Sequence, residues 1–177
     1  MSQPGRKPSK ATGPVYIGVD PGLGITGYGI LEHLNGRIIL KEAGCIRTNR
    51  KAPMENRIAE IYEGLNEIIA EFKPEQVVIE DLYSHYRHPK TAIIMGHARG
   101  AIFLSAATAG LPVKSYGATM IKKSLTGNGR ASKLQIQRMV KAKLGLPKMP
   151  EPPDVADALA VALCHISHLD NSKMENE

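Results

Sequence analysis

The order of apolar and polar positions predicts three antiparallel strands at the start of the chain. The segment 15–20 (VYIGVD) is a short apolar run, and the segment 25–33 alternates apolar and polar side chains, as half-buried strands do. The segment 37–48 is again typical of extended chain, and the Asn35-Gly36 pair before it favours a tight hairpin turn. We therefore expect an antiparallel sheet from these three segments.

The following part of the chain alternates helices with short strands. Apolar residues recur at helical spacing between residues 54 and 72, which predicts one long helix ending before Pro74. The apolar run 76–80 (QVVIE) is typical of a buried strand. An Ala-rich helix over 91–109 and a strand at 113–116 (VKSY) complete this region.

Two further helices are expected near the end of the chain. Ser132 with Gln135 three residues later forms a capping-box pattern, which predicts a helix to about Leu144. The last helix begins after Pro152-Pro153 and has an apolar stripe. The whole order predicts an α/β fold, with a mixed five-stranded sheet of three antiparallel strands followed by parallel β-α-β-α-β, flanked by helices.

Length and composition agree with one folded unit. The 177 residues fit a single domain, for which we expect a disordered basic tail at 1–14, a folded domain at 15–169 and a flexible C-terminal tail at 170–177. Only two cysteines occur, so a reducing, cytoplasmic location is expected. No apolar segment has the length of a membrane span or a signal peptide, so no membrane partner is expected.

The distribution of charge points to a polyanionic partner. The chain has 23 Lys or Arg and 17 Asp or Glu, giving a net charge of +6, and the stretch 84–150 holds 12 of the basic residues and no acid. Solvated faces usually mix both signs, so nucleic acid is favoured over a merely solvated basic surface.

A glycine pattern resembles a dinucleotide-binding fingerprint but is interpreted otherwise. Residues 22–27 match G-x-G-x-x-G, and Glu42 lies 20 residues beyond Gly22. That fingerprint must open a helix, whereas the residues that follow are broken by glycine and alternate like a strand. Asp20 would also direct a carboxylate at the pyrophosphate, so a nucleotide role is disfavoured.

Four carboxylates are candidates for one shared site. Asp20 and Glu80 end strands, and Asp154 and Asp157 lie three residues apart in the first turn of the last helix, so the latter two project from one side. If the first and fourth strands are neighbours, all four converge. Two carboxylates about 4 Å apart repel by roughly 4 kcal/mol at an effective dielectric of 20, so either some protonate or cations bind. Two divalent ions would balance four charges, and oxygen-only ligands favour Mg²⁺ or Mn²⁺.

Each acid also has a simpler interpretation. Asp20 before Pro21-Gly22 is typical of a turn, and Glu80 is compatible with a solvent-exposed strand end or a lysine partner. Asp154 and Asp157 suit the positive end of a helix. The combination of four acids with an acid-free basic stretch favours the shared site.

Five separated motifs resemble those of RuvC-type Holliday-junction resolvases. They are GVDPGLGITGYGIL, GCIRT, VIEDLY, GHARG and PDVADALAVALCH, in the family's order and spacing, over about residues 16–168. The resemblance implies a ribonuclease H-like nuclease domain over 15–169. It also implies a homodimer that needs two Mg²⁺ ions per subunit, for which Mn²⁺ can substitute, and that resolves four-way DNA junctions by paired symmetric nicks leaving 5′-phosphate and 3′-hydroxyl ends.

The resemblance also implies residue roles and partners. The four acids fall on the family's metal-binding catalytic positions, Lys122 and Lys133 on two basic positions linked to DNA contact and catalysis, and Tyr83 on an aromatic position, often Phe, that contacts bases at the junction. Coupling to a branch-migration complex (RuvA and RuvB) is implied as well. From the basic stretch we add three residues expected to hold DNA phosphates: Arg87, Lys123 and Arg130.

Two other functions are kept as alternatives. Sugar-kinase and actin-like phosphotransferases share a D-x-G strand-turn-strand start, but they place ATP between two such domains, and this chain has the length of one. A DNA-binding protein without catalysis would follow if the acids were only caps and turns. Cleavage of a four-way junction with Mg²⁺ or with chelator separates these hypotheses.

Overall fold

The computed structural model describes residues 13–81 and 89–174. Within these residues the chain forms five strands and five helices, in the order β1 (Val15–Asp20), β2 (Ile25–Leu34), β3 (Arg37–Arg47), α1 (Met54–Phe72), β4 (Gln76–Glu80), α2 (Pro89–Thr108), β5 (Val113–Tyr116), α3 (Ala118–Thr126), α4 (Lys133–Lys143) and α5 (Pro153–Met174).

The strands form one mixed sheet in the order β3-β2-β1-β4-β5. Strands β1, β2 and β3 pair antiparallel, while β1–β4 and β4–β5 are parallel. Asn35 and Gly36 both have positive φ, at 51° and 73°, as a primed hairpin turn requires. The expected sheet and its hairpin are therefore confirmed.

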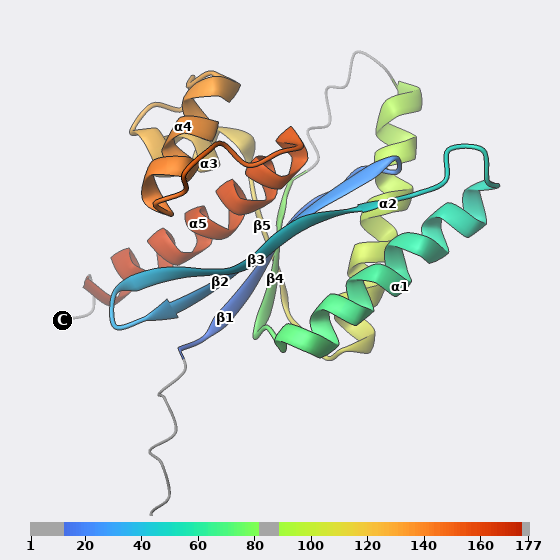
Figure 1. Ribbon diagram of the computed structural model, residues 1–177, viewed down its shortest axis with the longest axis horizontal. Helices are drawn as coiled ribbons and strands as arrows, with labels where there is room; N and C mark the ends of the chain where they lie inside the picture. Colours follow the sequence, from blue (N-terminus) through green and yellow to red (C-terminus); the bar gives the residue numbers. More distant parts are fainter. Residues whose placement is uncertain (1–12, 82–88, 175–177) are drawn as a thin grey trace, which may run out of the picture.

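Helices cover both faces of the sheet, giving three layers (Figure 1). One face packs against α1 and α2 around Ile17, Ile61 and Ile102. The other face packs against α3, α4 and α5 around Leu31, Val140 and Leu159. Central strands that are covered on both faces have almost continuously apolar sequences, and for this reason β1 and β4 were recognisable in the sequence.

Most helix boundaries follow the local signals. The helix α1 ends at Phe72, and α4 begins after Ser132 with a complete capping box, in which Gln135 N–H donates to Ser132 Oγ at 3.3 Å and Ser132 N–H donates to Gln135 Oε1 at 2.8 Å. None of the helices described in residues 13–81 and 89–174 is both long and apolar enough to cross a membrane.

Two helical segments go beyond the expectation. The helix α3 was not predicted; it lies between Gly117 and Gly127, the latter with a left-handed φ of 75° that ends the helix, and glycine adopts such a φ without steric cost. The helix α5 continues to Met174, into the segment from residue 170 for which a flexible tail is expected, and the flexibility of that segment stays a prediction. Of the expected basic tail, residues 1–12 lie outside the described part of the chain.

Candidate functional site

Two of the four candidate acids end neighbouring parallel strands. Asp20 is the last residue of β1 and Glu80 the last of β4, and Val19 pairs with Ile79 one residue earlier. Because carboxyl ends of parallel strands lie at the same sheet edge, both acids are at one end of the central strand pair. The structure thus pairs the first strand with the fourth, which is the condition under which the sequence predicted that the four acids would converge.

The other two acids are brought to this edge by α5, which lies unusually close to the sheet. A Cβ on Gly27 would lie 2.2 Å from the carbonyl oxygen of Asp154, and a Cβ on Gly18 would lie 2.1 Å from that of Ala158. No side chain fits at such distances, so both positions need glycine. Gly27, the last glycine of the G-x-G-x-x-G pattern, thus belongs to a helix-packing surface on β2, a structural role that needs no nucleotide.

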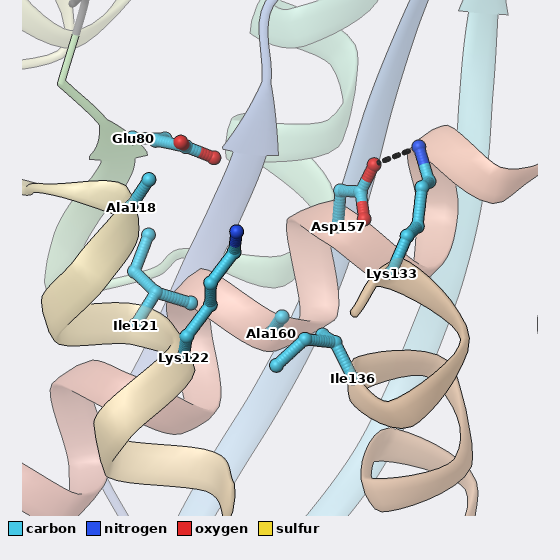
Figure 2. Close-up of a pocket in the computed structure, with 8 residues that line it drawn as sticks. All are labelled: Glu80, Ala118, Ile121, Lys122, Lys133, Ile136, Asp157 and Ala160. Atoms are coloured by element: carbon cyan, nitrogen blue, oxygen red, sulfur yellow. Dashed lines mark hydrogen bonds and ion pairs between the residues drawn. The ribbon is translucent and has the colours of Figure 1, made fainter. Parts of the chain in front are cut away.

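A cavity of about 210 Å³ opens beside the acids. Figure 2 shows Glu80 pointing into it from β4 and Lys122 from α3, while Asp157 on α5 and Lys133 on α4 close another side. Four side chains of small or apolar type complete the lining: Ala118, Ile121, Ile136 and Ala160. The cavity therefore combines carboxylates and ammonium groups with an apolar wall.

The acids influence one another electrostatically. Burial, followed by the charges of Asp157, Asp154 and Glu80, raises the pKa of Asp20 from 3.8 to about 7, with Lys133 acting in the opposite direction. Burial and the charge of Asp157 also raise the pKa of Glu80, against the nearby Lys122 and Lys133. Desolvated neighbouring carboxylates disfavour each other's ionised forms. The region therefore has an excess of negative charge that the two lysines only partly offset.

Lys133 is already paired within the site. Its Nζ lies 2.7 Å from Asp157 Oδ2, and this hydrogen bond raises the pKa of Lys133. Among the described residues, no three Asp, Glu, His or Cys side chains converge as a ready-made metal cluster. The carboxylates are thus close enough to shift one another's pKa, but in the described residues they do not form a preassembled set of metal ligands.

The remaining expected DNA-binding residues have different placements. Lys123 is exposed and lines a second cavity with His168, and Arg130 is exposed between α3 and α4. Tyr83 and Arg87 lie outside the described residues. Lys122 and Lys133 therefore face the carboxylates, whereas Lys123 and Arg130 lie at more peripheral positions.

Sequence reasoning missed two contributors to the site. The helix α3, which carries Lys122, could have been found from the two flanking glycines and the i, i+4 pair Ile121 and Leu125. Arg99 on α2 hydrogen-bonds the backbone carbonyl of Glu80. No sequence pattern indicated that contact, because it joins elements 19 residues apart.

The protein-family model for "Crossover junction endodeoxyribonuclease RuvC" matches residues 16–165. The chain belongs to the RuvC family. Membership makes it a crossover junction endodeoxyribonuclease and disfavours the phosphotransferase alternative.

Individual members of the RuvC family support this assignment. A crossover junction endodeoxyribonuclease from Rhodopirellula baltica is 50% identical over 148 residues, covering 84% of this chain and 83% of the relative. One from Moorella thermoacetica is 45% identical over 163 residues, covering 92% and 97%. The solved structure of Thermus thermophilus RuvC in complex with a Holliday junction substrate has a TM-score of 0.83 at 34% identity, covering 88% of this chain and 94% of that one. The expected ribonuclease H-like fold is thereby confirmed.

Proposed function

We propose that this protein resolves four-way DNA junctions by divalent-metal-dependent hydrolysis, using Asp20, Glu80, Asp154 and Asp157. The products are paired symmetric nicks with 5′-phosphate and 3′-hydroxyl ends. The observation that carries the proposal is geometric: Asp20 and Glu80 end adjacent parallel strands, and Asp157 of α5 lines the same cavity as Glu80. Two lysines also line that cavity.

The chemistry of the donors fits a hard divalent cation. The four acids supply only oxygen atoms, which Mg²⁺ prefers and Mn²⁺ accepts. Asp20 is largely buried among three other acids, which raises its pKa to about 7, and a cation would relieve that repulsion. Two such ions at a phosphodiester would activate a water molecule and stabilise the departing 3′ oxygen.

The chain's own side chains hold and balance charge. Asp20 and Glu80 each end a strand in the centre of the sheet, so their backbone is held by strand pairing. Lys122 points into the cavity beside Glu80 (Figure 2), where its ammonium can donate to a phosphate oxygen. Lys133 Nζ lies 2.7 Å from Asp157 Oδ2 and offsets its charge. The same ammonium group can donate a hydrogen bond to the scissile phosphate and stabilise the negative charge that develops there.

DNA binding outside the cavity is assigned to phosphate contacts. Lys123 and Arg130 are exposed and belong to the acid-free stretch 84–150. Phosphate contacts position DNA but carry no sequence information. Selectivity for a junction is therefore assigned to the paired geometry of two subunits and to Tyr83, whose ring can stack on bases.

A homodimer would supply two sites for two opposing strands. The helix α2 exposes apolar side chains, with Ile93 at 63% and Leu104 at 54% exposure, and we assign the subunit contact to this helix. Coupling to a RuvA and RuvB branch-migration complex and a cytoplasmic location remain predictions from the resemblance and composition. The oligomeric state is measured by sedimentation.

The decisive experiment compares a labelled four-way junction with a linear duplex, each incubated with Mg²⁺, with Mn²⁺ or with chelator. We expect paired nicks on the junction alone, only with metal. Glu80→Gln should bind the junction in chelator like the wild type yet lose cleavage by about 100-fold or more. The matched control is Glu63→Gln, which removes an exposed acid on α1 and should leave cleavage unchanged.

Two results would contradict the proposal. Full cleavage by Glu80→Gln would remove that residue from the catalytic set. Junction binding that is indifferent to Mg²⁺, without any cleavage by the wild type, would instead support the alternative of a non-catalytic DNA-binding protein.

A further inference from the structure

Arg99 is a buried charge beside the site, and the proposed chemistry gives it no role. It lies in α2 and is only 9% exposed. Removing a guanidinium from water is costly unless it is paired and hydrogen-bonded. The partners of such a group therefore indicate what its burial achieves.

The guanidinium joins α2 to the ends of two strands. Nη1 donates to the carbonyl oxygen of Glu80, and Nη2 donates to Ser115 Oγ on β5 at 3.0 Å. Nη2 also lies 3.6 Å from Asp81 Oδ1. The guanidinium carbon stands 4.9 Å from the centre of the Phe103 ring, one turn further along α2, within the range of a cation-π contact.

These contacts hold one peptide plane at both of its polar atoms. The carbonyl of Glu80 and the N–H of Asp81 belong to the same peptide group. Arg99 donates to that carbonyl, and the N–H donates to the carbonyl oxygen of Tyr116 on β5 at 2.9 Å. A planar peptide group held at both ends cannot rotate, so the backbone at the end of β4 has a defined orientation.

That orientation defines ψ of Glu80 and so restricts the rotamers of its side chain. Glu80 is the last residue of β4. Its carboxylate points into the cavity opposite Asp157 (Figure 2). Because the allowed side-chain rotamers of a residue depend on its own φ and ψ, a displacement of the peptide that follows Glu80 would change the rotamers open to Glu80 and move its carboxylate relative to the other acids.

We propose that Arg99 is a positioning residue for the nuclease site: it fixes the peptide plane after Glu80 and thereby holds Glu80 in a rotamer that directs its carboxylate into the metal site. This inference rests on the proposed function in one respect, which is that Glu80 is a metal ligand. Arg99 itself does not touch the reacting atoms.

The geometry requires arginine rather than any cation. The fork of a guanidinium reaches Glu80 and Ser115 from one rigid plane, whereas a lysine ammonium is a single point on a flexible stem. Arg99→Lys should therefore retain charge and one contact but hold the peptide less well. Arg99→Met removes every polar contact while keeping an apolar stem of similar length.

The test measures metal binding as well as cleavage. Mn²⁺ affinity is measured by titration calorimetry on the protein without DNA, for wild type, Arg99→Met, Arg99→Lys and a control, Ser105→Ala. Ser105 is a fully buried residue on the same helix whose Oγ donates to the Tyr62 carbonyl at 3.3 Å, away from β4. Junction cleavage (kcat and KM) and junction binding in chelator are measured in parallel. All assays are run at a temperature well below the thermal unfolding midpoint of each protein.

We expect a graded and selective loss. Arg99→Met should weaken Mn²⁺ binding and lower kcat by about 10-fold or more, as loss of a residue that orients a metal ligand does. KM and junction affinity in chelator should stay within about twofold. The Mn²⁺ affinity and kcat of Arg99→Lys should lie between those of Arg99→Met and wild type. Ser105→Ala should match wild type in both quantities.

The inference is overturned if Arg99→Met and Arg99→Lys keep wild-type Mn²⁺ affinity and kcat, even with a lower thermal midpoint, because Arg99 would then be only structural. Equal losses in Ser105→Ala would overturn it too. If Arg99→Met does not fold, Arg99→Lys decides alone. Failure of the proposed function looks different: wild type would not nick junctions, while Mn²⁺ affinity would still report on Arg99.

Discussion

Asp20 should destabilise the metal-free fold at neutral pH, so that Asp20→Asn loses cleavage but gains stability. Burial and three neighbouring acids raise the pKa of Asp20 from 3.8 to about 7. Each tenfold change in proton affinity corresponds to about 1.4 kcal/mol. Ionising Asp20 above pH 7 therefore costs the folded state on the order of 4 kcal/mol relative to the unfolded chain.

The sign of the pH dependence follows from proton binding. Between about pH 4 and pH 7 the folded state keeps the Asp20 proton that the unfolded chain has lost, so this residue makes stability fall as pH rises through that window. Above pH 7 its contribution is constant. Asn carries no charge at any pH, so the substitution should add about 2 to 4 kcal/mol at pH 8 and almost nothing near pH 4.

His165 titrates in the opposite sense and must be separated from Asp20. Burial, with the charges of Lys114 and His168, lowers the pKa of His165 from 6.5 to about 4. In that range the unfolded chain binds the extra proton, so stability falls as pH falls. The difference between Asp20→Asn and wild type cancels this contribution, because both proteins contain His165.

The assay is urea unfolding in the presence of chelator, monitored by circular dichroism and repeated at several pH values between 4 and 8. Glu63→Gln, which changes an exposed acid on α1, is the control and should differ little from wild type at every pH. Added Mg²⁺ should stabilise wild type more than Asp20→Asn, since a ligand that binds only the folded state raises stability. An Asp20→Asn protein less stable than wild type at pH 8 in chelator, or a difference that does not vary with pH, would refute the reasoning.

Three further predictions concern single contacts. Lys133→Met, which removes the 2.7 Å contact with Asp157, should lower kcat by about 100-fold with junction binding in chelator little changed; single-turnover cleavage checks this, and an unchanged kcat contradicts it. Gly27→Ala places a Cβ 2.2 Å from the Asp154 carbonyl oxygen, so urea unfolding should show a loss of about 2 kcal/mol or more, and Mn²⁺ affinity should fall; wild-type values for both would contradict the close packing of α5. Tyr116→Phe deletes the 2.9 Å hydrogen bond to His165 Nδ1 and should cost about 1 kcal/mol in urea unfolding, without a change in metal affinity.

Local patterns were sufficient for most of the elements. The strands β1 and β4 are covered on both faces and read as apolar runs, and α1 has a clear helical stripe because only one face is buried. The capping box at Ser132 is formed by residues within one turn. The helical segments that were not predicted also have a local cause: α3 spans only Ala118–Thr126, which is too short for a strong periodic signal, and the polar end of α5 beyond residue 169 lacks an apolar stripe.

The sequence by itself determined the residue types of the candidate site, the strand ends and helix turn that carry them, and the family to which they belong. Only the tertiary structure decided that β1 and β4 are neighbours and that glycines on the sheet allow α5 to approach. It alone joined Arg99 to the Glu80 peptide. The physical reason is that spacing along the chain encodes contacts within a turn or a strand. A shared electrostatic environment, which raises the pKa of Asp20, depends on distances between elements remote in sequence.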